Sequence, residues 1–159
     1  MTWYCYWSPY KKAPWNLTLS SERDNIVAAG KAEFITALDL DCDVSDTDND
    51  AANVRYRGDF YLDFDSDRLD ETIEKVNEFL DHLVNKMQMN LDQVRFFASG
   101  KKGFHIEVPQ ACFLPKPSPT GYARLPYIYR EMAYEMFTDT LDLNVYTAKK
   151  GRMWRVCNF

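Results

Sequence analysis

A regular succession of extended and helical segments, beginning near Gly58, constrains the fold more than any other feature of the sequence. Phe60–Phe64 is a short run of residues that favour β-structure, and apolar residues then recur every three or four positions, as on one face of a helix. Val94–Ala98 and Phe104–Val108 are further predicted strands. Because the glycine-bounded turn SGKKG separates them, we expect an antiparallel hairpin.

Two helices complete this pattern. The first follows Asp67, whose carboxylate suits the cap of a helix. The second begins at Pro126, continues to about Leu141 and is followed by a last strand, Met153–Cys157. The order β-α-β-β-α-β is that of ferredoxin-like and RNA-recognition-like domains, in which the last strand lies beside the first. We therefore predict an α+β protein with a split βαβ core. The apolar residues expected to form the buried helical faces are Leu69, Ile73, Val76, Leu80, Leu83 and Met87 in the first helix and Ile128, Met132, Met136 and Leu141 in the second.

The chain has 159 residues, the size of one domain, and we expect a single domain with a core over 58–159 and an N-terminal α/β appendage over 1–57. Six aromatic residues crowd the first fifteen positions. An N-terminal strand that packs its rings on the domain is one interpretation. A base-stacking platform is the alternative.

The cysteines and the N-terminus bear on compartment and metal. Four cysteines lie far apart without CxxC or Cys/His spacing, so we expect no zinc site and a reducing compartment. No apolar stretch approaches the roughly 20 residues that cross a bilayer, and the N-terminus lacks the apolar block of a signal peptide. We therefore expect a cytoplasmic protein with no membrane partner.

The first candidate site is the carboxylate pair Asp63 and Asp65 in YLDFDSD. Residues two apart on a strand point to the same face, so both carboxylates would project together at the strand's end. Such a pair is stabilised by a divalent cation, of which Mg²⁺ and Mn²⁺ are the natural candidates. A solvated acidic strand edge is the alternative.

The second candidate site is the segment from Ser99 to His105. Its two glycines permit a turn with exposed N–H groups, Lys101 and Lys102 bring positive charge, and Ser99 offers a hydroxyl, which together describe a cradle for phosphates. His105 could donate to a phosphate oxygen. A plain hairpin turn with solvated lysines is the alternative.

The third candidate site combines Asp142 with a basic C-terminal segment that contains Arg152, Arg155 and Asn158. Both arginines lie at or in the last predicted strand, which we expect beside the acid-bearing strand. Guanidinium groups near a metal site suit phosphate or template contact. A solvated basic face is the alternative.

Taken together, the three sites resemble the motifs of the archaeo-eukaryotic primase superfamily, the primase-polymerases of archaea, eukaryotes, plasmids and phages. RGDFYLDFDSD is similar to the first motif, FFASGKKGFHIEV to the second and LDLNVYTAKKGRMWRVCN to the third, in the same order. The resemblance implies that Asp63, Asp65 and Asp142 bind two Mg²⁺ or Mn²⁺ ions. It implies nucleotide binding by Ser99, Lys101, Lys102, His105, Arg152, Arg155 and Asn158.

The activity implied is template-directed nucleotidyl transfer, by a DNA primase or primase-polymerase acting on single-stranded DNA with NTP or dNTP substrates. A helicase or a further domain would be an additional partner. Since members commonly continue beyond the third motif, we expect either a fragment or a very small member. Two alternatives stay open: a non-catalytic module that binds single strands, and another two-metal enzyme such as a nucleotide cyclase or nuclease.

The net charge of −5 argues at first against a nucleic-acid partner. However, residues 1–93 carry 9 basic and 19 acidic side chains, whereas residues 94–159 carry 10 basic and 5 acidic ones. The average thus conceals a basic part that holds most of the predicted phosphate contacts. We expect a weak affinity for the template, which falls steeply as the salt concentration rises.

Overall fold

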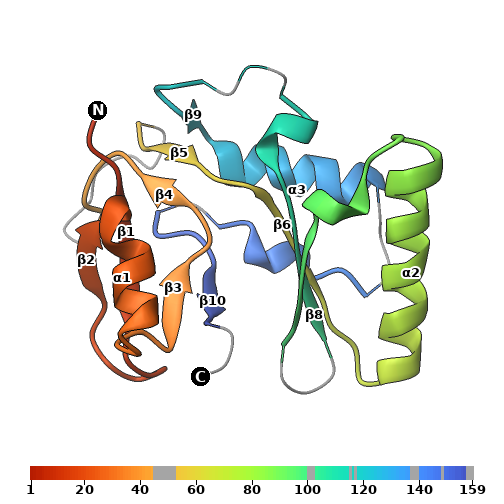
Figure 1. Ribbon diagram of the computed structural model, residues 1–159, viewed down its shortest axis with the longest axis horizontal. Helices are drawn as coiled ribbons and strands as arrows, with labels where there is room; N and C mark the ends of the chain where they lie inside the picture. Colours follow the sequence, from red (N-terminus) through yellow and green to blue (C-terminus); the bar gives the residue numbers. More distant parts are fainter. Residues whose placement is uncertain are drawn as a thin grey trace. The chain divides into compact units, whose positions relative to one another are not determined.

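The computed structural model describes residues 1–44, 53–99, 103–114, 116, 118–136, 140–147 and 149–156. Over these residues the chain is a mixed α+β protein, as expected, with three α-helices (Figure 1). No helix in this part is both long and apolar enough to cross a bilayer. In chain order the elements are β1 (Tyr4–Ser8), β2 (Asn16–Leu19), α1 (Arg23–Ala28), β3 (Phe34–Thr36), β4 (Asp39–Leu40), β5 (Arg55–Arg57), β6 (Phe60–Phe64), α2 (Leu69–Asn85), β7 (Arg95–Ala98), β8 (Phe104–Val108), β9 (Tyr122–Ala123), α3 (Leu125–Met136) and β10 (Met153–Arg155).

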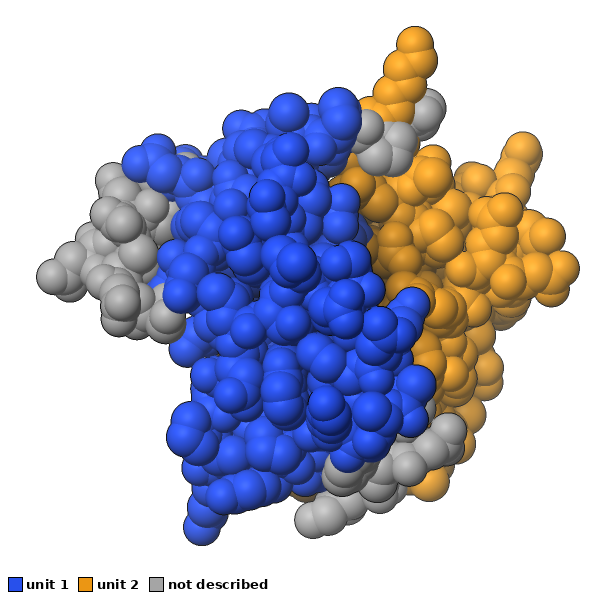
Figure 2. All heavy atoms as spheres, turned by 60° about the vertical axis from the view of Figure 1, so that its left-hand side comes forward, with its two compact units in different colours: residues 1–58, 118–127, 146–159 blue, residues 59–117, 128–145 orange. Residues whose placement is uncertain are grey.

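The chain divides into two compact units, coloured separately in Figure 2. Unit 1 comprises residues 1–58, 118–127 and 146–159, and unit 2 comprises residues 59–117 and 128–145. Unit 1 holds a seven-stranded antiparallel sheet in the order β10-β3-β1-β4-β5-β9, with β2 also paired to β1. Unit 2 holds a three-stranded antiparallel sheet in the order β6-β8-β7.

Aromatic side chains help to fill the interior of unit 1. Trp3 and Tyr6 are 8% and 1% exposed, so the expected burial of N-terminal rings is confirmed for these two of the six, whereas Tyr10 is 56% exposed. Gly121 has a φ of +67°, and a Cβ there would overlap the Trp3 ring. Arg55 also binds this segment. Its Nε donates to the carbonyl of Thr120 at 2.6 Å and its Nη2 to the carbonyl of Gly121 at 2.7 Å. Segment 118–127 is thereby joined to N-terminal residues far from it in sequence.

Aromatic rings also form the core of unit 2. Phe60 and Phe64, on one face of β6, are fully buried. The ring of Phe64 lies 5.5 Å from that of Phe79 in α2, and the ring of Phe60 lies 5.1 Å from that of Tyr129 in α3. Burying such large rings is a main source of core stability. Both helices thus pack on the same face of the strand.

The buried face of α2 differs from the predicted one. Val76 and Leu83 are buried as expected, but Leu69 and Ile73 are 45% and 42% exposed. Thr72 and Phe79 are buried in their place. The packing of the Phe79 ring against β6 decides which side of the helix faces the sheet. The buried residues of α2 are Thr72, Val76, Phe79 and Leu83.

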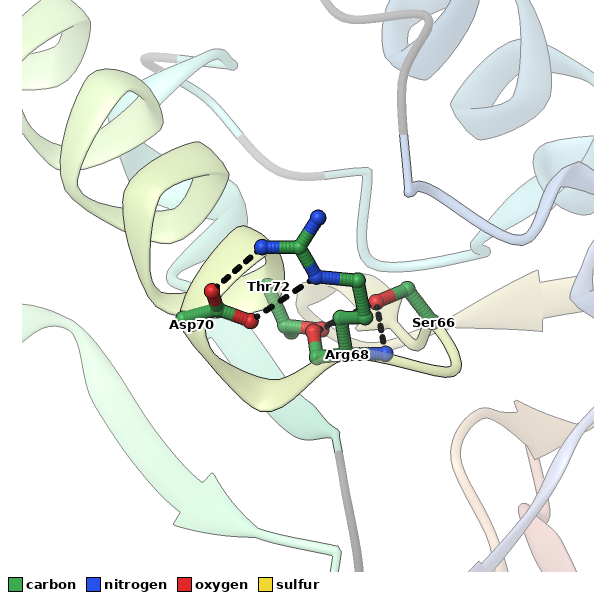
Figure 3. A network of polar contacts seen from close by, with 4 residues as sticks. All are labelled: Ser66, Arg68, Asp70 and Thr72. Carbon is green, nitrogen blue, oxygen red and sulfur yellow. Dashed lines mark hydrogen bonds and ion pairs between the residues drawn. The ribbon is translucent and has the colours of Figure 1, made fainter.

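The start of α2 is stabilised by a small polar network (Figure 3). The hydroxyl of Ser66 accepts the N–H of Arg68 at 3.0 Å, and the hydroxyl of Thr72 donates to the Arg68 carbonyl at 3.1 Å. Arg68 also pairs with Asp70, with Nη2 and Oδ2 2.6 Å apart, and this hydrogen bond lowers the pKa of Asp70. The prediction that Asp67 caps the helix is wrong, since Arg68 occupies the cap position and makes no side-chain cap bond.

The end of the chain departs most from expectation. β10 pairs with β3 in unit 1, not with β6. Arg155 in β10 and Arg152 just before it therefore do not share a sheet with the acid pair, contrary to the prediction. The described part of α3 ends at Met136, and Leu141, expected on its apolar face, instead forms an isolated antiparallel bridge with Phe64.

Candidate active site

One face of the unit 2 sheet carries the first candidate carboxylate. Asp63 on β6 lies directly opposite His105 on β8, so both side chains project to the same face. Asp63 is only 5% exposed, and its Oδ1 lies 3.3 Å from Nε2 of His105. A buried carboxylate is costly unless polar groups compensate it. His105 therefore stabilises and orients Asp63.

Asp142 is brought beside Asp63 by the backbone. Its N–H donates to the Asp63 carbonyl at 2.9 Å, next to the bridge between Leu141 and Phe64. The N–H of Asp65 donates in turn to the carbonyl of Thr140, also at 2.9 Å. These two bonds align residues 140–142 antiparallel to the end of β6. The third predicted acid is thereby held at the strand that carries the first.

The side chain of Asp142 also shapes the segment that follows it. Its Oδ1 accepts the N–H of Asn144 at 2.9 Å, a turn typical of aspartate at the start of a helix. The short 3-10 helix Leu143–Val145 begins there. The carboxylate is half-buried. In this position it holds its own backbone in place beside β6.

Asp65 directly follows β6 in the chain. Because β6 pairs with β8, Asp65 lies beside the turn that connects β7 to β8. The turn is closed by a bond from the Ser99 N–H to the Gly103 carbonyl at 2.9 Å. A Cβ on Gly103 would lie 2.5 Å from the Phe64 carbonyl oxygen, 3.0 Å from the Ser99 hydroxyl and 3.4 Å from Oδ1 of Asp65. Only glycine fits this gap without displacing its neighbours. Ser99 and Asp65 thus lie on either side of the same glycine. Their motifs, considered separately, did not predict this proximity.

Thr140 is a residue of this site that no sequence pattern indicates. Its φ is +59°, a left-handed conformation that is unusual for a β-branched residue. Its Oγ1 is buried and has no hydrogen-bond partner among the described residues. A threonine in a polar loop carries no sequence signal for either property. The strain is located at the residue whose carbonyl binds the Asp65 N–H.

Arg95 neutralises acids elsewhere on this face. Its Nη2 lies 2.8 Å from Oδ2 of Asp59 and 2.8 Å from Oε2 of Glu107. Arg95 lies opposite Glu107 in the strand register, and Asp63 is four residues further along the chain than Asp59. Arg95 therefore forms its ion pairs at the end of β6 that is opposite to Asp65.

The donor chemistry of the three acids suits a hard divalent cation, because carboxylate oxygens are the preferred ligands of Mg²⁺ and Mn²⁺. Among the described residues, however, no three His, Cys, Asp or Glu side chains form a group that could hold a metal ion. Two of the acids already have polar contacts. One oxygen of Asp63 faces His105, and one oxygen of Asp142 accepts the Asn144 N–H.

The remaining predicted residues lie in unit 1 or outside the described part. Arg155 stacks its guanidinium over the ring of Phe34 at 5.5 Å, and its Nε lies 3.6 Å from Oε1 of Glu33. Arg152 lies over the ring of Trp154 at 5.5 Å. Planar contacts of this kind hold guanidinium groups in defined orientations. Lys101, Lys102 and Asn158 lie outside the described residues.

Comparison with known proteins gives no relative. No protein-family model matches the chain, and neither a curated protein nor a solved structure matches it.

Proposed function

We propose that the chain is a primase-polymerase core that joins nucleotides on a single-stranded DNA template. The observation that carries the proposal is the 2.9 Å bond from the Asp142 N–H to the Asp63 carbonyl. It brings together two acids that lie in the first and third of the motifs. Two acids that share a metal ion must lie close together in this way.

On this proposal unit 2 is a split βαβ sheet whose fourth strand is reduced to a bridge. The order β6-β8-β7 is compatible with three of its strands. Residues 140–142 pair antiparallel with the free edge of β6, where the fourth strand would lie. The chain then leaves this edge and returns to unit 1 as β10.

Asp63, Asp65 and Asp142 would hold two Mg²⁺ or Mn²⁺ ions. Such ions lower the pKa of an attacking hydroxyl and stabilise the charge of a leaving pyrophosphate. The backbone already holds Asp142 beside Asp63, so new side-chain rotamers, without a shift of strands, would let the carboxylates converge. His105 would orient Asp63 throughout, as its 3.3 Å contact supports.

The turn before β8 would bind the phosphates of the incoming nucleotide. Ser99 lies at this turn beside Asp65, and Lys101 and Lys102 belong to the same segment. A hydroxyl, lysine ammonium groups and backbone N–H groups are suited to phosphate oxygens. Arg152, Arg155 and Asn158 would supply further nucleotide contacts from the C-terminal segment.

A primer-extension assay tests the proposal. Labelled nucleotide is incorporated on a single-stranded template with and without primer, with Mg²⁺ or Mn²⁺, for ribo- and deoxynucleotides. Asp63→Asn and Asp142→Asn should each reduce extension by about 100-fold or more, because each removes a metal ligand. Asp24→Asn, an exposed acid in α1, is the matched control and should retain full extension.

Circular dichroism and thermal melting of each variant confirm that it is folded. Extension that persists in Asp63→Asn and Asp142→Asn refutes the assignment of the acids. Products that form without template would indicate a cyclase or nuclease instead. Strand binding without any metal-dependent product would indicate a binding module.

A further inference from the structure

Helix α2 carries a second apolar face in addition to the one that packs on β6. Its members, which we call the outer stripe, are exposed or half-buried large apolar side chains that lie four, seven and four positions apart. At 3.6 residues per turn, this spacing confines them to an arc of about 60°. The outer stripe consists of Leu69 (45% exposed), Ile73 (42%), Leu80 (half-buried) and Val84 (41%).

The outer stripe extends beyond the contact between α2 and its own sheet. The residues that pack toward β6 are centred on Phe79, whose ring contacts Phe64. By the helical repeat, Ile73 and Val84 lie more than about 90° around the helix from Phe79. Figure 1 shows α2 flanking the β6–β8 strands with its other side turned away from them. By the same repeat, Leu69 and Leu80 lie within about 40° of the buried Val76 and flank the packed face, so core packing leaves only Ile73 and Val84 unaccounted for.

Acidic residues border the outer stripe. α2 contains five Asp or Glu residues and one Lys. By the same helical repeat, Asp70, Asp81 and Glu74 lie about 70–110° from the middle of the outer stripe, and Glu78 and Glu71 lie about 150–170° from it. Asp70 pairs with the exposed Arg68, whereas the described residues give Glu74 and Asp81 no ion pair. The surface therefore combines apolar side chains with negative charge along one edge.

We propose that the outer stripe is the docking site for a basic amphipathic helix of a partner protein. Such a segment would place apolar residues at i, i+3 or i+4 and i+7 against Leu69, Ile73 and Val84, with Lys or Arg beside them. Ammonium and guanidinium groups at the rim would face Glu74 and Asp81 and would speed association at low salt. A second copy of this chain is disfavoured as the occupant, because two acidic rims would repel. An anionic membrane is disfavoured for the same reason.

Fluorescence anisotropy with the full chain tests the proposal. The probe is a labelled amphipathic peptide of leucine and lysine, about 18 residues or five helical turns long. Its control is the same peptide with every lysine replaced by glutamate. We expect saturable binding of the lysine peptide alone, with an affinity that falls as salt rises.

Two pairs of variants locate the site. Ile73→Gln with Val84→Gln should weaken binding by about tenfold or more by removing apolar contacts. Glu74→Lys with Asp81→Lys should weaken it by a similar factor. Glu71→Lys with Glu78→Lys makes the same change in net charge farther around the helix from the outer stripe, although it also breaks the ion pair of Glu78 with Lys75, and it should alter affinity by less than about threefold.

Three outcomes would overturn the proposal. Equal loss in both lysine variants would show that net charge alone attracts the peptide. Unchanged binding in the glutamine variant would show that the outer stripe is not the contact. A dimer of the free chain, seen by analytical ultracentrifugation and abolished by the glutamine variant, would make the face a self-interface. Should the glutamine variant fail to fold, as judged by circular dichroism, the comparison of the two lysine variants still decides.

Discussion

The substitution Gly103→Ala tests the close packing between β6 and the turn before β8. The added methyl carbon would lie 2.5 Å from the Phe64 carbonyl oxygen. An ordinary van der Waals contact of a Cβ is 3.4–4 Å, so the turn and the end of β6 must move apart by about 1 Å. Overpacking of this kind costs about 1–3 kcal/mol. No positive φ is involved at this position, so backbone strain adds nothing to the cost.

Urea denaturation measures this cost. With a slope of about 2 kcal/mol per molar urea, a loss of about 2 kcal/mol lowers the midpoint by about 1 M. Amide chemical shifts should change most at Phe64, Asp65 and Ser99, because these residues line the gap. Gly30→Ala is the control, since no atom lies within 4 Å of its Cβ and only its φ of +64° is unfavourable. A Gly103→Ala protein with the parent's midpoint and unchanged shifts at Asp65 and Ser99 would refute the reasoning.

Three further predictions concern burial. Thr140→Val should raise the melting temperature by about 2–4 °C by removing a buried hydroxyl that has no partner among the described residues; a lower melting temperature would show that the hydroxyl is satisfied. Phe79→Ala should cost about 3–5 kcal/mol in urea denaturation. Ile73→Ala, at an exposed position of the same helix, should cost less than about 1 kcal/mol, and similar costs at both positions would contradict the assigned buried face. Burial raises the pKa of the Cys5 thiol to about 11, so iodoacetamide at about pH 8 should modify the half-exposed Cys112 and leave Cys5 intact, as mass spectrometry would show.

Local patterns predicted the elements of unit 2 well. The strands Phe60–Phe64 and Phe104–Val108 have the predicted bounds, and the glycine-bounded turn joins an antiparallel hairpin as expected. These signals depend on neighbouring residues alone. The rotation of α2 does not, because the fit of Phe79 against Phe64 decides which side of the helix is buried. Leu69 and Ile73 satisfied the helical spacing equally well and are exposed.

Long-range pairing was beyond the sequence patterns. β10 was expected beside β6 and lies beside β3, since a three-residue strand has no local feature that names its partner. The same pairing separates Arg152 and Arg155 from the sheet of the acid pair. In the candidate site the acids were selected by their motifs, whereas the opposition of Asp63 and His105 depends on strand register. Thr140 could not be selected, because neither its positive φ nor its place beside the bridge between Leu141 and Phe64 follows from the neighbouring residues in the sequence.

The pairing of β10 with β3 has a consequence for how the chain folds. Trp154 meets Ile35 across this pair, so synthesis must pass residue 154 before the seven-stranded sheet can close. The β6-β8-β7 sheet and α2 use only residues 60–108, and α3, whose Tyr129 packs on Phe60, is also complete before residue 154 is made. Contacts that distant in sequence slow folding, because a long loop must be closed first. The site-bearing sheet should therefore form early, and the closing of the N-terminal sheet should limit the overall rate.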